Sequence, residues 1–106
     1  MIQITFKPNT MELEINGHAS HGKKGEDIVC SAVSTLFYTL AETLYQSTEM
    51  LSAMPIVKTE DGVGYIWSNA KPPYEGNVQM MYMTVLNGLR MVAENYPKNV
   101  SFRVKE

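Results

Sequence analysis

The chain predicts an α+β domain, a two-layer sandwich in which two long helices pack on one face of a mixed sheet. Three short segments alternate apolar and polar residues, as strands with one solvent-exposed face do. Two longer segments repeat apolar residues every three or four positions, as amphipathic helices do. With a further predicted hairpin the order is ββαββαβ, and helices that cover one face of such a sheet form two layers.

The first two strands are expected at residues 2–7 and 11–16. Apolar and polar side chains alternate through both segments. Pro8-Asn9-Thr10 between them is a turn signal, so the two strands should form a hairpin. The side chains that should face the helices are Ile2, Ile4, Phe6, Met11, Leu13 and Ile15.

The first helix is expected from about residue 28 to residue 47, because apolar residues recur at helical spacing from Ile28 to Leu44. Asp27 suits the N-cap position, where a carboxylate accepts backbone N–H groups. Cys30 then lies in the first turn, at the flank of the apolar stripe. Ser34 follows one turn later on the same flank.

A second hairpin is expected from strands at 56–59 and 63–67. Glu60-Asp61-Gly62 is the turn between them, because Asp-Gly is a strong hairpin signal. Residues 68–76 contain two consecutive prolines and predict a loop.

The second helix is expected at about 77–96, where Pro97 ends it, and a last alternating strand follows at 100–105. The apolar stripe of this helix is unusually broad. It is widened by Met80, Met83, Leu86 and Met91. Such a stripe is typical of a wide core contact, or of a helix that also contributes to a homodimer interface.

Composition restricts the protein class. A length of 106 residues with 44% hydrophobic and 19% charged residues predicts one globular domain over 1–106. A net charge of −2 argues against a nucleic-acid partner. A single cysteine excludes an internal disulfide and fits a reducing, cytoplasmic environment. The alternating start predicts neither a signal peptide nor a membrane-spanning segment.

The residues with reactive chemistry gather at 17–34, which hold both histidines and the cysteine. Unpaired N–H groups and the positive helix end favour the thiolate form of Cys30, and those N–H groups could also form an oxyanion hole. His18 could take the thiol proton and return it to a leaving amine. Parity along the strand would point His18 to the solvent face, so the turn at Gly17 must redirect it.

Other interpretations use the same residues. A lone cysteine is commonly a buried small apolar residue. His18, His21 and Cys30 could bind zinc, although a closed zinc site needs four ligands and a second cysteine is missing. A non-catalytic binding protein would keep its function without the Cys30 thiol.

The run GHASHGKKGEDIVCSAVS resembles the signature of the ribosomal-processing cysteine protease family, Prp. The positions that match the family pattern are Gly17, His18, Ala19, Gly25, Asp27, Ile28, Val29, Cys30 and Ser34. The resemblance implies a cysteine endopeptidase without a cofactor or metal, with Cys30 as nucleophile and His18 as base. Asp27 and Ser34 would be supporting residues, with Asp27 either capping the helix or orienting His18.

The resemblance also implies a mobile lid, a partner and a substrate. Gly17, Gly22 and Gly25 would give the loop the freedom to close over a bound peptide. The family members look dimeric, which favours a homodimer. The substrate would be the N-terminal extension of large-subunit ribosomal protein twenty-seven, cut after a pair of phenylalanines to support ribosome assembly. A prophage-encoded copy would instead process capsid or scaffold proteins.

Overall fold

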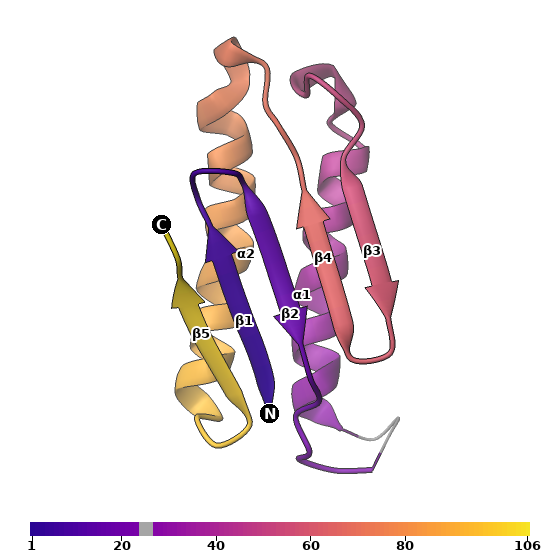
Figure 1. The fold of residues 1–106 in the computed structure, drawn as a ribbon, viewed down its shortest axis with the longest axis vertical. Helices are drawn as coiled ribbons and strands as arrows, with labels where there is room; N and C mark the ends of the chain where they lie inside the picture. The colour runs from indigo at the N-terminus through magenta and orange to yellow at the C-terminus, as the bar shows by residue number, and fades with distance from the viewer. Residues whose placement is uncertain (24–26) are drawn as a thin grey trace.

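The computed structural model describes residues 1–23 and 27–106 and contains two layers. Two helices lie side by side across one face of a five-stranded sheet (Figure 1). The elements are β1 (Ile2–Lys7), β2 (Glu12–Asn16), α1 (Ile28–Tyr45), β3 (Ile56–Glu60), β4 (Val63–Trp67), α2 (Glu75–Asn95) and β5 (Val100–Val104). The predicted α+β class and the ββαββαβ order are therefore confirmed.

The sheet is mixed, with the strand order β3-β4-β2-β1-β5. β1 runs parallel to β5, whereas the pairs β1–β2, β2–β4 and β3–β4 are antiparallel. The connection from β2 to α1 leaves the sheet at the end where the β3–β4 turn lies (Figure 1). This arrangement brings the loop after β2, the start of α1 and the β3–β4 turn to one end of the molecule.

The core lies between the sheet and the helices. Alternation places Ile4, Leu13 and Ile66 on the helix side of three neighbouring strands, and all three are at most 1% exposed. Tyr82 of α2 is fully buried among them, and its hydroxyl lies 2.6 Å from the Ser68 hydroxyl. This hydrogen bond satisfies the two buried polar groups that the apolar core would otherwise leave unpaired.

The boundaries differ from the sequence prediction at several places. β2 begins at Glu12, one residue late, because Met11 has a φ of +53° and belongs to the turn. α1 ends at Tyr45, and a 3-10 turn over Thr48–Met50 follows. α2 starts at Glu75 inside the predicted loop, because a 3-10 turn at Pro72–Tyr74 leads directly into it.

Gly17 determines where the chain goes after β2. Its φ is +101°, and a Cβ atom there would lie 2.1 Å from the carbonyl oxygen of Met1. Its N–H donates to the carbonyl of Gly62 at 2.7 Å, which continues the β2–β4 pairing into the β3–β4 turn. The positive φ redirects the chain, so that His18 joins a pocket on the helix side of the sheet, as the sequence analysis required.

α1 is long and apolar enough, by length and composition alone, to cross a membrane. The patterns in the sequence indicated no membrane-spanning segment. A core helix of a soluble protein passes the same test. In this fold one side of α1 is buried, through Val29, Val33, Phe37, Leu40, Ala41 and Leu44. Composition alone does not separate the two kinds of helix, and the buried side is what a core helix shows.

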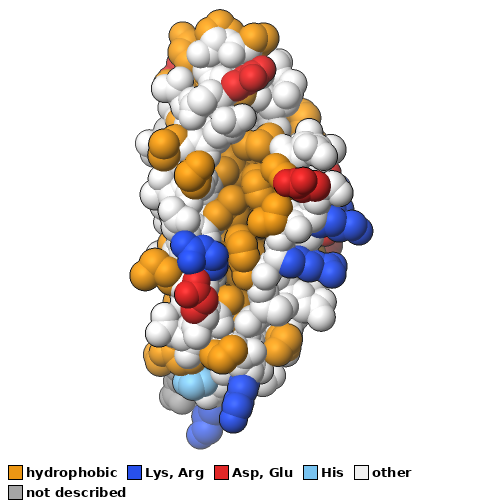
Figure 2. Space-filling model, turned by 90° about the vertical axis from the view of Figure 1, so that its left-hand side faces the viewer, with side chains coloured by type: hydrophobic (Ala, Val, Ile, Leu, Met, Phe, Trp, Pro, Cys, Tyr) orange, Lys and Arg blue, Asp and Glu red, His pale blue; other side chains and the backbone are white. Residues whose placement is uncertain are grey.

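The side of the molecule that carries α2 and β5 exposes apolar side chains. Figure 2 shows the side of the molecule formed by α2 and β5, where apolar side chains gather along a hollow. Met80, Met83 and Met91 of α2 and Val104 of β5 are more than half exposed. The three methionines are among the four residues that widen the predicted stripe of α2, and the fourth, Leu86, is partly buried against the core. The homodimer itself stays a prediction, which the mass of the protein in solution would test.

Gly17→Ala should destabilise the fold, because an alanine at positive φ is strained and its Cβ would press on the Met1 carbonyl. We expect a loss of about 1–3 kcal/mol in the free energy of unfolding, measured by urea denaturation. Gly76→Ala is the matched control, since among residues 1–23 and 27–106 no atom outside its own stretch of helix lies within 4 Å of the added Cβ. Equal urea midpoints for the two variants would contradict the role assigned to Gly17.

Candidate active site

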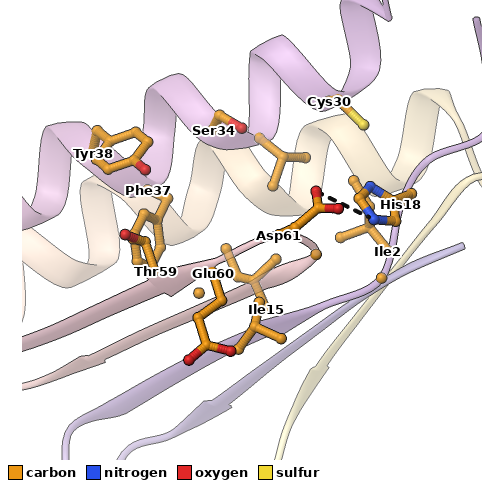
Figure 3. Close-up of a pocket in the computed structure, with 15 residues that line it drawn as sticks. Ile2, Ile15, His18, Cys30, Ser34, Phe37, Tyr38, Thr59, Glu60 and Asp61 are labelled. Carbon is orange, nitrogen blue, oxygen red and sulfur yellow. Dashed lines mark ion pairs between the residues drawn. The ribbon is translucent and has the colours of Figure 1, made fainter. Parts of the chain in front are cut away.

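A pocket of about 250 Å³ opens between the start of α1 and the β3–β4 turn (Figure 3). Its apolar wall is formed by side chains of β1, β2 and α1, among them Ile2, Ile15 and Phe37. Its polar rim is formed by His18, Cys30, Ser34, Tyr38, Thr59, Glu60 and Asp61. The pocket therefore brings together His18, Cys30 and Ser34, three of the residues that the sequence singled out.

Cys30 lies in the first turn of α1, and its side chain is half-buried at the pocket rim (Figure 3). Its Sγ atom accepts a hydrogen bond from the backbone N–H of Ala19 at 3.5 Å. The thiol thus faces a backbone donor of the loop as well as the positive end of the helix.

Asp27 is the N-cap of α1, as predicted, and it is buried. One carboxylate oxygen accepts the N–H groups of Val29 at 2.9 Å and Cys30 at 3.0 Å. The other accepts the N–H of His21 at 3.0 Å, which ties the loop to the helix. The hydrogen bond from the Cys30 backbone is the main reason that the pKa of Asp27 is lowered.

These contacts bear on two questions that the sequence left open. Both oxygens of Asp27 are used by backbone N–H groups, which favours the capping role over an orientation of His18. The same contacts occupy the N–H groups of Val29 and Cys30, and that of Ser31 donates to the Asp27 carbonyl at 3.0 Å. First-turn groups that are already bonded in this way are poorly placed to form an oxyanion hole.

His18 lies beside the β3–β4 turn. Its Nε2 atom is 3.7 Å from Oδ1 of Asp61, and both side chains are more than half exposed (Figure 3). The imidazole lies over Gly62, where an added Cβ would come within 2.9 Å of Nε2. A larger residue at that position would displace the ring.

Asp61 is a site residue that the sequence analysis treated only as part of a turn signal. The register of β2 and β4 pairs Asn16 with Val63, and the Gly17–Gly62 hydrogen bond extends it by one residue. One step further, the same register places His18 opposite Asp61. The contact follows from the pairing of β2 with β4, and the sequence did not predict this pairing because α1 and β3 lie between the two strands in the chain.

Ser34 and the loop residues occupy the surroundings of Cys30. Ser34 follows Cys30 by one turn on the same side of α1 (Figure 3). Gly22 is exposed, and Gly25 lies outside the described residues. The imidazole of His21 packs edge-on against Tyr96, with ring centroids 5.3 Å apart. The supporting role of Ser34 and the mobile lid stay predictions.

Metal binding receives no geometric support from residues 1–23 and 27–106. Within these residues no group of three His, Cys, Asp or Glu side chains could hold an ion. The pocket instead combines a thiol, an imidazole and a carboxylate beside an open apolar cavity. Such an arrangement suits nucleophilic attack on a bound substrate, with the imidazole as the proton carrier.

Comparisons with known proteins agree with this chemistry. The family model described as cysteine protease Prp matches residues 1–101. The ribosomal processing cysteine protease Prp of Staphylococcus aureus is 24% identical over 104 residues, which are 98% of this chain and 95% of that protein.

Solved structures extend the similarity to the fold. A crystal structure of the essential ribosomal processing protease Prp from S. aureus, with a covalently linked product peptide, has a TM-score of 0.82 and 26% identity. The alignment covers 99% of this chain and 100% of that one. A Streptococcus mutans protein has a TM-score of 0.70 and 30% identity, over 98% of this chain and 93% of that one.

Replacing Asp27 should test the cap and the loop contact together. At neutral pH, Asp27→Ala is expected to lower Tm by about 4–8 °C, because three N–H groups lose their acceptor. Asp27→Asn should lower Tm by less, since an amide oxygen still caps the helix.

The pH dependence has a defined sign. Because folding lowers the pKa of Asp27, its stabilisation is present above the ordinary value of 3.8 and is lost as the pH falls through the lower folded value. Thermal unfolding should therefore show a wild-type advantage over Asp27→Asn at neutral pH that shrinks well below pH 3.8. An advantage that stays constant in acid would exclude the ionised carboxylate as its source.

Proposed function

The chain belongs to the Prp family of cysteine proteases, and we propose that it cuts peptide bonds with Cys30 as nucleophile and His18 as general base. The single observation that carries this assignment is the pocket that Cys30 and His18 share with an apolar wall. The thiol and the imidazole come from segments separated by the glycine-rich loop, and both border space that a peptide could fill.

The proposed reaction follows the geometry of the pocket. His18 takes the thiol proton, and Sγ of Cys30 attacks the carbonyl carbon of the substrate to form a carbon–sulfur bond. The carbon–nitrogen bond breaks as His18 returns the proton to the leaving amine. Water, deprotonated by His18, then hydrolyses the thioester and restores the thiol.

The proposed substrate is the N-terminal extension of large-subunit ribosomal protein twenty-seven, cut in the cytoplasm to support ribosome assembly. The relatives described as ribosomal processing proteases support this substrate class. The pocket is also compatible with it, because the apolar wall suits phenylalanine side chains. Glu60 and Asp61 give the rim a negative charge that suits a basic peptide.

Cleavage of a matching peptide tests the proposal directly. A peptide with the phenylalanine pair of the extension should be cut by the wild-type protein, and mass spectrometry would locate the cut. Cys30→Ala should lower the rate by about 10³-fold or more, because no other residue of the pocket replaces the nucleophile.

The control arms separate the alternatives. An alanine pair in place of the phenylalanines should abolish cutting if the apolar wall recognises them. A peptide that binds equally to wild-type and Cys30→Ala protein without being cut would favour a non-catalytic ribosome-associated binder. Cutting of phage capsid or scaffold proteins alone would replace the ribosomal substrate.

We further propose that Asp61 stabilises the protonated form of His18 during the reaction. The 3.7 Å contact is exposed, so the effect should be moderate. Asp61→Asn is expected to lower kcat/KM by about two- to fivefold.

Glu60→Gln is the matched control for Asp61→Asn. Glu60 lines the same pocket and carries the same charge, but the ion pair of His18 is with Asp61. If both variants lower kcat/KM equally, the general negative charge of the rim is responsible and the specific role of Asp61 is wrong.

A further inference from the structure

The peptide groups on either side of Ala19 are held by partners far apart in the sequence. The N–H of Ala19 donates to Sγ of Cys30 at 3.5 Å. Its carbonyl accepts a hydrogen bond from the side-chain amide of Asn99 at 2.7 Å. The methyl group of Ala19 is 1% exposed, so the residue is packed into the core while its two polar groups are bonded. Its position therefore determines which donor faces the sulfur.

Asn99 is itself firmly placed by the main chain. Its N–H donates to the carbonyl of Tyr96 at 2.9 Å, and its carbonyl accepts the N–H of Ile2 at 2.8 Å. These bonds fix it between the end of α2 and the start of β5, beside β1. The side-chain amide is then free to bond the loop, and a short rigid connection makes such a bond precise.

The same connection touches the loop a second time. Tyr96, the residue after α2, packs edge-on against His21, whose N–H is held by Asp27. The α2–β5 connection and the N-cap of α1 thus hold the loop from two sides. Asn99 is the member of this set that bonds to the residue whose N–H faces Cys30.

We propose that Asn99 is a positioning residue, which holds Ala19 so that its N–H stabilises the negative charge on Sγ of Cys30. The proposal rests on the proposed role of Cys30 as nucleophile. The N–H groups of Val29 and Cys30 already donate to Asp27, which leaves the Ala19 N–H as the backbone donor to the sulfur among the described residues. A donor to a charged acceptor contributes more than one to a neutral acceptor.

Other charges around the thiol stay constant when Asn99 is changed. His18, Glu60 and Asp61 line the same pocket, and Asp27 caps the helix that carries Cys30. Asn99 is neutral and contacts the loop through Ala19. A change in thiol reactivity in an Asn99 variant therefore reports the placement of the Ala19 N–H and not a new charge.

The test measures the reactivity of Cys30 without any substrate. Alkylation by iodoacetamide follows the thiolate fraction, so the second-order rate is measured at about pH 7 and at about pH 10. Asn99→Leu removes the amide at similar size and should lower the rate at neutral pH by about five- to tenfold. The rates of variant and wild type should converge at alkaline pH, where the thiol is ionised in both.

Two further variants keep the proposal falsifiable. Asn95→Leu is the matched control, because the Asn95 amide also donates to a backbone carbonyl, that of Met91 at 2.7 Å, but within α2. It should alkylate like wild type. Asn99→Gln keeps the amide donor and should recover part of the lost rate, which also covers the case that Asn99→Leu fails to fold.

The outcomes are distinct. A wild-type rate for folded Asn99→Leu at neutral pH would overturn the proposal. So would an equal loss at both pH values, because that pattern indicates altered access to the thiol. If Asn99→Leu does not fold, a rate for Asn99→Gln below that of Asn95→Leu at neutral pH alone would support the proposal, and equality would overturn it. Because no peptide is used, failure of the proposed protease function would appear separately, as absent cleavage with normal alkylation.

Discussion

The hydrogen bond from the N–H of Gly17 to the carbonyl of Gly62 is the constraint on which the geometry of the site depends. It closes the β2–β4 pairing at the end of the two strands, beside the β3–β4 turn, with both residues at positive φ. At this point the chain leaves the sheet and turns toward the helices. Without this exit, the alternation of β2 would carry His18 to the solvent face, away from Cys30.

The loop that begins there is held by short, ordinary interactions. Asp27 uses one carboxylate oxygen for the start of α1 and the other for the N–H of His21. Asn99, in the connection between α2 and β5, bonds the carbonyl of Ala19 on the other side of the loop. A pocket at the rim of a small domain has little surrounding protein. The hydrogen bonds of Asp27 and Asn99 therefore hold the loop in place, as close packing would do in a deeper site.

The candidate site separates stability from chemistry. Asp27 is buried and satisfied by backbone donors, so its charge serves the fold. His18 and Asp61 are exposed, so their side chains remain available to a substrate and to solvent. Cys30 lies between these two environments, half-buried on the first turn of α1. A reactive thiol needs both accessibility and nearby donors, which is the combination found there.

Local patterns in the sequence were enough to predict the helices and strands and to identify the residues with reactive chemistry. Alternation, helical spacing and the Asp27 cap are local, so they predicted five strands, two helices and the ββαββαβ order. The pattern around His18 and Cys30 likewise pointed to a cysteine protease of the Prp family, to which the chain belongs.

The contacts between residues that are distant in the sequence became visible in the folded chain alone. The contact of His18 with Asp61 follows from the pairing of β2 with β4, and the bond from Asn99 to Ala19 joins positions 80 residues apart. Local patterns carry no information on such pairs, because strand order and the path of a loop depend on how the whole core packs. The structure also showed that the N–H groups of Val29 and Cys30 donate to Asp27 and are therefore not free donors.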